Sequence, residues 1–329
     1  MPTNLPPDYF NVEEKFRTAR SVEEKIGYLE EMMAIVPKHK GTDRLRADLR
    51  RRLSQLKSES QTQKGGVSRQ VSPYRIPREG AGQVVLVGLA NVGKSALVDA
   101  FTNAEPEVAA HPFTTWSPTP GMMPIENIQV QLIDTPPLNP DFIKSDMMDL
   151  IRRADLLLIV VDLQTFPIEQ LEETVAILED QRIVPACLRD RYSDRFDLTF
   201  VPTLVVANKT DDESLEEDFE VLKELLDEAW SLVPVSATTG HKVDQFKWKI
   251  YERLDIIRIY AKPPGKEPDM GSPFVMRRGG TVEDFAAKVH QDFVKNLKSA
   301  RIWGEGVYDG QAVGRDHVLH DGDIVELRT

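Results

Sequence analysis

The segment at residues 88–95 constrains the fold of this chain more than any other stretch. It follows an apolar run at 83–87 and precedes a mostly apolar run at 96–101, so it is expected to join a strand to a helix. Its letters, GLANVGKS, match the phosphate-loop pattern G-x-x-x-x-G-K-[ST]. Glycines let backbone N–H groups close around phosphate oxygens, and the helix adds the positive end of its dipole. The sequence therefore predicts a nucleoside triphosphate site rather than an ordinary glycine turn.

Two side chains of this loop are expected to contact the triphosphate and its metal ion. Lys94 would reach the β- and γ-phosphates as a catalytic point charge, and Ser95 would bind Mg²⁺. The remaining residues assigned to the phosphate site are Asn91, Val92, Gly93 and Ala96.

A second motif, Asn208-Lys209-Thr210-Asp211, follows the apolar run at 204–207 and predicts which base is bound. The Asp211 carboxylate can accept N1–H and the exocyclic amino group of guanine as a bidentate pair. Adenine lacks both donors in that arrangement and would leave a buried carboxylate unpaired. Lys209 is expected along the plane of the base, and Asn208 is expected to tie this loop to the phosphate loop. A polar turn after a strand is the alternative.

Two further strand ends complete the predicted nucleotide site. Asp134 follows the apolar run at 130–133 and can hold Mg²⁺ through a water molecule. Ser236 and Ala237 follow the run at 232–235, where the Ala237 N–H can be donated to the guanine O6. Neither signal is specific alone, and both gain weight from their order along the chain.

The stretch between the phosphate loop and Asp134 contains the letters HPFTTW at residues 111–116. A threonine here can complete the Mg²⁺ coordination and sense the γ-phosphate, giving a segment that orders with the triphosphate and loosens after its hydrolysis. We favour Thr115 over Thr114 for this catalytic and metal-binding role. The alternative is a surface loop without a switch function.

The order of apolar and amphipathic segments predicts an α/β fold. Strand-like runs at 84–87, 130–133, 156–161, 204–207 and 232–235 alternate with helix-like segments at 95–102, 142–153, 168–180, 214–229 and 241–261. Continuous apolar strands separated by helices are typical of a mostly parallel sheet covered on both faces. Ligands of such sheets bind at the carboxyl ends of the strands, where the phosphate loop is expected.

Four regions are predicted along the chain. They are a helical region at 1–60, a linker at 61–82, a nucleotide-binding domain at 83–262, and a small α+β domain at 271–329. The first is expected to be a helical hairpin. Between residues 38 and 57 it carries eight Lys or Arg against two Asp. This basic stretch is either a solvated helix face or a contact for RNA phosphates.

Composition limits the possible partners and compartments. A net charge of −12 argues against a chain that coats nucleic acid over its whole surface. No apolar run approaches the roughly 20 residues that span a bilayer, so no membrane association is expected. The single cysteine, Cys187, fits a protein of the reducing cytosol, and we predict a cytoplasmic location.

These motifs resemble those of Obg-superfamily GTPases, and most closely those of the developmentally regulated GTP-binding (DRG) proteins. The resemblance is carried by the letters at 88–95, 112–115 and 208–211 and by Pro120-Gly121. Residues 277–283, 300–304 and 320–325 are similar to a TGS domain, a β-grasp-like module. The resemblance implies a P-loop GTPase domain, binding of GTP and GDP, hydrolysis of GTP, and association with ribosomes or RNA through the basic helices and the TGS domain.

Three features depart from common GTPase patterns or add to them. The D-x-x-G motif of the family ends here in Pro137, which has no N–H to donate to a γ-phosphate. Leu138 stands where Ras-like proteins place a water-orienting glutamine, so slow intrinsic turnover is expected. Asn91 occupies a loop position that binds K⁺ in several GTPases. The chain also lacks room for the β-rich insertion of DRG proteins, since residues 180–200 accommodate only a short insert.

Two functions are compatible with this pattern. The first is a GTPase in which a positioned water attacks the γ-phosphate and charge neutralisation supplies the catalysis. The second is a nucleotide-dependent scaffold with negligible hydrolysis, which Pro137 favours.

Overall fold

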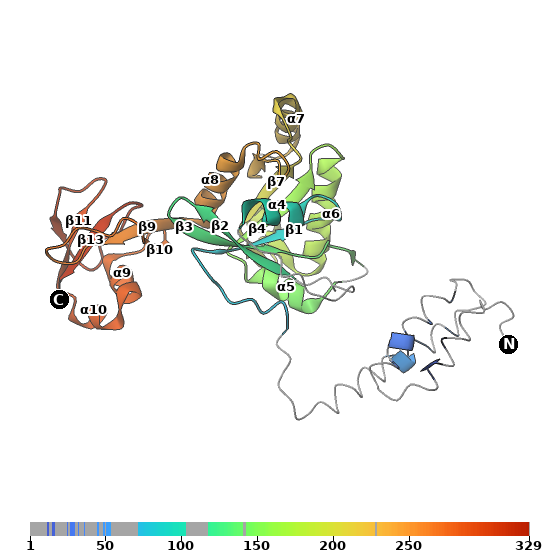
Figure 1. Ribbon diagram of the computed structural model, residues 1–329, viewed down its shortest axis with the longest axis horizontal. Coiled ribbons are helices and arrows are strands. Elements are labelled where there is room, and N and C mark those ends of the chain that lie inside the picture. Colours follow the sequence, from blue (N-terminus) through green and yellow to red (C-terminus); the bar gives the residue numbers. More distant parts are fainter. Residues whose placement is uncertain are drawn as a thin grey trace. The chain divides into compact units, whose positions relative to one another are not determined.

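The computed structural model describes residues 72–102, 118–140, 143–227 and 229–328, together with scattered positions between 12 and 53 (Figure 1). The chain divides into two compact units, Met1–Val71 and Ser72–Thr329. Thr115, the rest of the segment 111–116 and most of the basic stretch 38–57 lie outside the described residues.

The described positions of the first unit are helical, apart from Val36. A small buried cluster contains Val12, Leu29, Met32, Val36 and Leu49. The sequence predicts a helix break at Pro37 and Gly41, and the members of this cluster come from both sides of it, so the two flanking segments share one core.

A six-stranded sheet forms the centre of the second unit, with strand order β2-β3-β1-β4-β7-β8. Its strands are β1 (Gln83–Val87), β2 (Thr119–Ile125), β3 (Ile128–Asp134), β4 (Leu156–Asp162), β7 (Thr203–Asn208) and β8 (Leu232–Pro234). Neighbouring strands are parallel except β2 and β3, which form an antiparallel hairpin. The predicted α/β fold with a mostly parallel sheet is confirmed.

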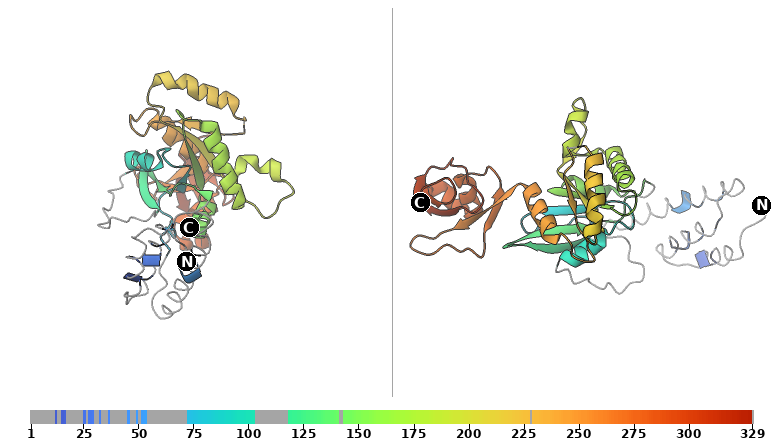
Figure 2. Two further views of the ribbon diagram at one scale, coloured as in Figure 1. Left: turned by 90° about the vertical axis from the view of Figure 1, so that its right-hand side faces the viewer. Right: turned by 90° about the horizontal axis from the view of Figure 1, so that it is seen from above.

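Helices cover both faces of this sheet (Figures 1 and 2). They are α4 (Lys94–Phe101), α5 (Ser145–Arg152), α6 (Pro167–Asp180), α7 (Glu216–Leu225) and α8 (Val243–Leu254). In β1, Val84 and Leu86 pack in one core with α4 and α8, whereas Val85 and Val87 pack in a second core with α5 and α6. Side chains alternate between the faces of a strand, so a run that is apolar at every position is buried on both sides.

The segment between α6 and β7 holds a short insert. It consists of β5 (Ile183–Pro185), the 3₁₀ helix η2 (Ala186–Tyr192) and β6 (Thr199–Val201), and β5 and β6 pair in parallel. A second 3₁₀ helix, η3 (Glu213–Leu215), leads into α7.

A second sheet, with five strands in the order β10-β9-β13-β11-β12, forms the C-terminal part of this unit. Its elements are β9 (Ile256–Ala261), β10 (Phe274–Arg277), α9 (Val282–Val289), α10 (Gln291–Asn296), β11 (Ser299–Trp303), β12 (Gln311–Val313) and β13 (Ile324–Arg328). Thr281 and Asp284 form a capping box at the start of α9. Phe285 of α9 is fully buried in the core that the helix shares with this sheet.

Two expectations about this region are corrected by the structure. The helix predicted at 241–261 ends at Leu254, and its last six residues form β9. This strand lies inside the range predicted for the nucleotide-binding domain, yet it pairs with β10 and β13 of the second sheet. With Thr281 as its cap, the sequence predicts one helix from Val282 to Leu297, but the extended backbone of His290 separates α9 from α10. None of the described helices is long and apolar enough to cross a bilayer.

Candidate nucleotide site

The phosphate loop connects β1 to α4, as its sequence predicts, and two glycines give it its shape. Gly93 precedes the helix with a φ of 91°, in the left-handed region that side chains disfavour. A Cβ on Gly93 would lie 2.2 Å from Nδ2 of Asn208. A Cβ on Gly88 would lie 2.5 Å from the carbonyl oxygen of Val160 in β4. The loop is therefore closely packed against the two strands that follow β1 in the sheet order.

Lys94 is held inside this loop. Its side chain is buried, with 5% of the residue exposed, and Nζ donates to the carbonyl oxygens of Gly88 at 3.0 Å and Leu89 at 2.7 Å. Burial lowers the pKa of Lys94 to about 8, while the nearby Asp134 carboxylate opposes that shift. The ammonium group thus sits within the curve of the loop, where incoming phosphates could replace its carbonyl partners.

Ser95 and Asp134 form a pair suited to a divalent cation. Ser95 lies in the first turn of α4 and donates its hydroxyl to Oδ2 of Asp134, at the end of β3, over 2.5 Å. The other carboxylate oxygen, Oδ1, is buried and has no hydrogen-bond partner among the described residues. Burial raises the pKa of Asp134 against the opposing hydrogen bond from Ser95 and the charge of Lys94. Mg²⁺ prefers such oxygen ligands, with phosphates and waters completing its shell, so the residues fit the ion.

Asn208 joins the predicted base loop to the phosphate loop. It ends β7, is 2% exposed, and donates from Nδ2 to the carbonyl oxygen of Val92 over 2.9 Å. Its Oδ1 accepts from the backbone N–H of Ala237 at 3.3 Å. One buried amide therefore fixes three loops at the carboxyl ends of β1, β7 and β8.

The residues expected to read the base lie beside this amide. Ser236 is fully buried and donates its hydroxyl to Oδ1 of Asp211 over 2.6 Å. The Ser236 Oγ also accepts from the backbone N–H groups of Thr238 and Thr239. These bonds hold the Asp211 carboxylate in one orientation, which a bidentate contact with a base edge needs.

Two residues that the sequence reasoning missed belong to the same site. Asp162, the last residue of β4, pairs through Oδ2 with Nζ of Lys209 at 2.5 Å. Gln164 donates from Nε2 to the Lys209 carbonyl oxygen at 2.9 Å and to Oδ2 of Asp211 at 3.4 Å. A polar residue directly after the apolar run at 156–161 was the available signal, of the same kind that pointed to Asp134.

The segment after Asp134 is bound closely to β1. Thr135 donates its hydroxyl to the Leu86 carbonyl oxygen at 2.6 Å, and the Leu138 N–H donates to the Gly88 carbonyl oxygen at 3.1 Å. Leu138 is 4% exposed and belongs to the core beneath the sheet. Its side chain therefore faces the core and is unavailable to orient a water molecule.

The structure thus gathers most of the predicted residues at one edge of the sheet. The phosphate loop with Lys94 and Ser95 follows β1, Asp134 ends β3, residues 208–211 follow β7, and Ser236-Ala237 follow β8. Asn91 is an exposed residue of the loop with a φ of 65°. Thr115 is outside the described residues, so its predicted role stays a prediction.

Comparison with known proteins identifies both parts of the second unit. A family model described as 50S ribosome-binding GTPase matches residues 83–189, and the TGS domain model matches residues 257–329. The TGS match begins within β9, in agreement with the pairing of that strand.

Several proteins of known sequence are similar over nearly the full chain. An uncharacterized GTP-binding protein from Methanocaldococcus jannaschii is 32% identical, over 93% of this chain and 92% of its own. Developmentally-regulated GTP-binding protein 1 from Xenopus laevis is 28% identical, over 92% of this chain and 98% of its own. Ribosome-interacting GTPase 1 from Saccharomyces cerevisiae is 27% identical over the same shares of the two chains.

Proposed function

Because the chain belongs to the family of developmentally regulated GTP-binding proteins, we propose that it binds GTP with Mg²⁺ and hydrolyses it slowly to GDP and phosphate, in the cytoplasm and in association with ribosomes or RNA. The observation that carries the nucleotide part is the Asn208 amide. It joins the loop that holds Lys94 to the loop that holds Asp211. A phosphate-binding and a base-binding group thereby share one rigid edge.

Each part of the nucleotide has a defined set of residues. The phosphates would be bound by Lys94 and by backbone N–H groups of the loop residues Asn91, Val92, Gly93 and Ala96. The Ser95 hydroxyl and the Asp134 carboxylate, directly or through water, would hold Mg²⁺, which supplies charge neutralisation on the β- and γ-phosphates.

Guanine would be recognised by Asp211 and by the Ala237 N–H, with Lys209 along the base. Ser236 donates to Oδ1 of Asp211 and Gln164 makes a long contact with Oδ2, so the remaining lone pair of each oxygen is the acceptor left for guanine.

Hydrolysis is expected to be slow because of the segment after Asp134. Pro137 has no N–H for the γ-phosphate, and Leu138 is buried in the core. Positioning and charge neutralisation by Lys94, Mg²⁺ and the predicted Thr115 would supply what catalysis there is.

The base assignment is tested by replacing Asp211 with Asn. The amide can donate to the C2 oxygen of xanthine but not accept twice from guanine, so D211N should lose GTP affinity by at least about tenfold and gain affinity for xanthosine triphosphate. Titration with fluorescent GTP and XTP analogues measures both changes. Unchanged preference for GTP would remove the assignment of Asp211.

Ribosome association is supported by the names of a matching family, the 50S ribosome-binding GTPase family, and of a similar protein, the ribosome-interacting GTPase 1 of yeast. Pro137 favours a second candidate function, a scaffold that binds nucleotide without cycling it. Two measurements distinguish the GTPase from the scaffold. The first is the rate of GTP turnover with and without ribosomes. The second compares the affinity of the protein for ribosomes in the presence of GDP with that in the presence of a non-hydrolysable GTP analogue. Nucleotide drives a switch only if that affinity differs between the two states.

Asn91 adds a proposal about a second ion. As an exposed polar side chain of the phosphate loop, it is placed to share a K⁺ with the phosphates. Turnover should then be faster in KCl than in NaCl, and equal rates would exclude the proposal.

A further inference from the structure

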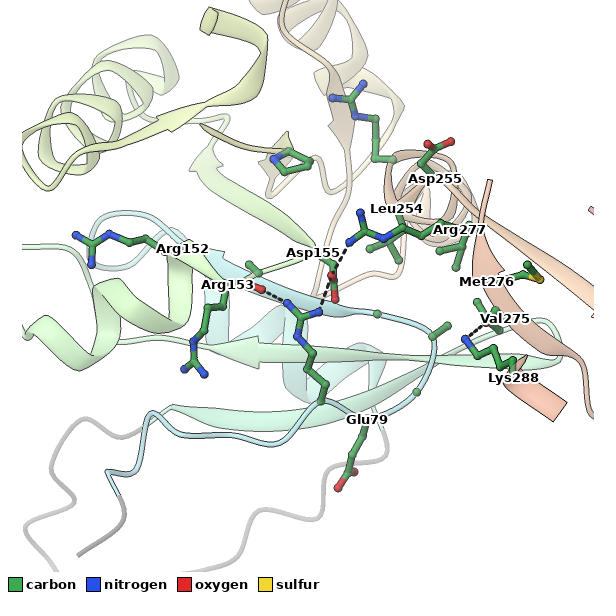
Figure 3. Close-up of a pocket in the computed structure, with 18 residues that line it drawn as sticks. Glu79, Arg152, Arg153, Asp155, Leu254, Asp255, Val275, Met276, Arg277 and Lys288 are labelled. Atoms are coloured by element: carbon green, nitrogen blue, oxygen red, sulfur yellow. Dashed lines mark hydrogen bonds and ion pairs between the residues drawn. The ribbon is translucent and has the colours of Figure 1, made fainter. Parts of the chain in front are cut away.

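A basic cleft lies on the side of the sheet opposite the nucleotide loops. It has a volume of about 610 Å³ and is lined by the segment 78–82, by residues just before β4 and β7, and by residues of β10 and α9 (Figure 3). The residues before β1, β4 and β7 lie at the amino ends of these strands, whereas the phosphate and base loops follow the carboxyl ends. A ligand in the cleft would therefore not compete with the nucleotide.

Cationic side chains dominate this cleft. Asp155 is its central carboxylate, and it pairs with two guanidinium groups, Arg78 at 3.1 Å and Arg277 at 3.7 Å. Asp255 pairs with Arg278, which lies outside the lining. Figure 3 shows Glu79 extending away from Asp155 and Arg277. Asp155 and Asp255 are thus already neutralised by arginines, and Glu79 points away from them.

Within the described part of the chain, three further cations of the cleft lack such a carboxylate partner. Arg153, Arg253 and Lys288 have no carboxylate within ion-pair distance among the residues that the structure describes. Arg153 and Lys288 instead donate to the backbone carbonyls of Asp149 and Val275, and Arg253 Nε is buried without a hydrogen-bond partner in the described part of the chain. This local excess of positive charge stands in a chain of net charge −12.

The exposure of these groups indicates the kind of anion that suits them. The side chain of Arg277 is 83% exposed and that of Arg78 is 56% exposed. A single exposed ion pair contributes only about 0–1 kcal/mol, so a small anion would gain little here. A polyanion that contacts several cations at once adds up these small contributions to the binding free energy, and it also releases counterions.

We propose that this cleft binds the phosphate backbone of RNA. The inference rests on the RNA or ribosome association proposed above, and it assigns that contact to the junction of the two sheets instead of to the basic stretch at 38–57. Arg277 and Lys288 from the C-terminal domain and Arg153 from the GTPase domain supply the charges, so RNA contacts both domains.

The test compares neighbouring arginines in the full-length protein. Arg277→Gln and Lys288→Gln each remove one positive charge from the cleft. Arg278→Gln is the control. Like Arg277, Arg278 pairs with a carboxylate, but it lies outside the cleft lining. Binding of a short fluorescein-labelled single-stranded RNA is followed by anisotropy over a series of KCl concentrations. Each cleft variant should bind several-fold more weakly and lower the slope of log affinity against log salt by about 0.7. R278Q should have a smaller effect than either, because it removes no cleft cation and only leaves the Asp255 carboxylate unpaired.

Three controls keep the outcomes distinct. Binding of a fluorescent GTP analogue and the thermal midpoint should be unchanged in all three variants, because none lies near the nucleotide loops. If the wild type binds RNA and R277Q and K288Q bind it as R278Q does, the cleft assignment is overturned and RNA association stands. If the wild type binds neither RNA nor ribosomes, the cleft assignment and the proposed RNA or ribosome association both fail, while the proposed nucleotide site is unaffected. Equal competition by poly-glutamate would also overturn the assignment to RNA.

Discussion

At the scale of single residues, Gly93 shows how closely the two nucleotide loops are fitted. Gly93→Ala adds left-handed backbone strain and places a Cβ 2.2 Å from the Asn208 amide, which must move and release Val92. Gly306→Ala is the matched control, because Gly306 has a φ of 79° and open space around it. We expect G306A to lower the free energy of unfolding by about 1 kcal/mol and G93A by roughly 2–4 kcal/mol.

Denaturant unfolding and GTP titration measure the two effects. G93A should also bind GTP at least about tenfold more weakly, whereas G306A should bind it normally. Equal stability of the two variants would mean that Asn208 moves at no cost, and its role as a rigid link would fail.

Lys94 gives the nucleotide-free protein a pH-dependent stability. Burial lowers its pKa from 10.5 to about 8, so the unfolded chain binds more protons between these two values. The contribution of Lys94 to the free energy of unfolding therefore rises with pH across that window, and below it the cost of burying the charge is fully present. Lys94→Met should lack this rise. Urea unfolding of the wild type and of Lys94→Met at about pH 7 and about pH 9.5 measures how much each free energy of unfolding changes with pH. The same change in both proteins would contradict the prediction.

At the scale of elements, the segment that follows β3 controls the expected rate of hydrolysis. Pro137→Gly restores a backbone N–H in the position where the family motif has one. One donor to a developing anion contributes about 10²–10³ in rate in well-ordered sites, so an increase of at least tenfold in single-turnover hydrolysis is expected. Pro136→Gly introduces the same flexibility one residue earlier and should leave the rate unchanged. If both variants hydrolyse GTP at the wild-type rate, Pro137 is not what limits turnover.

The elements also show where sequence reasoning succeeds and where it stops. The loops at 88–95 and 208–211 were predictable because local chemistry dictates their residues and parallel strands bring their ends to one edge. Strand β2 was missed because Pro120, Gly121 and Pro124 resemble a turn, and β2 is an edge strand, where proline is tolerated. Strand β9 was merged with α8 because a short apolar run after a helix has no period of its own. Only its pairing with β10 and β13 makes it a strand.

At the scale of the whole second unit, one arginine connects the GTPase domain to the C-terminal sheet. Arg258 of β9 pairs with Asp321 at 2.8 Å and with Glu126 in the turn between β2 and β3. Asn127 of the same turn donates to the Tyr260 hydroxyl at 2.8 Å. Burial acts to raise the pKa of Asp321, but the hydrogen bonds from Arg258 and Tyr251 outweigh it and lower that pKa. The β2–β3 turn thus contacts a well-paired ionic cluster.

This connection predicts that nucleotide state reaches the C-terminal sheet through the β2–β3 hairpin. Strand β3 ends at Asp134, one of the residues proposed to hold Mg²⁺, and its other end joins the turn that contains Glu126 and Asn127. We expect hydrogen exchange in β9 and β13 to differ between GDP and a non-hydrolysable GTP analogue. The double variant Glu126→Gln, Asn127→Ala should reduce that difference while GTP affinity is kept.

The matched control is Asp255→Asn. It breaks an exposed ion pair with Arg278 at the start of β9 but does not touch the hairpin, so it should leave the nucleotide-dependent difference intact. The control loses one exposed pair, which contributes about 0–1 kcal/mol, and the hairpin variant leaves Arg258 paired with Asp321, so we expect both variants to stay folded. Mass spectrometry of peptides covering β9 and β13 can then be compared directly. A difference that persists undiminished in the hairpin variant would mean that another route carries the signal. The continuous chain from α8 into β9 is then the path to examine, because the chain passes there from the first sheet to the second.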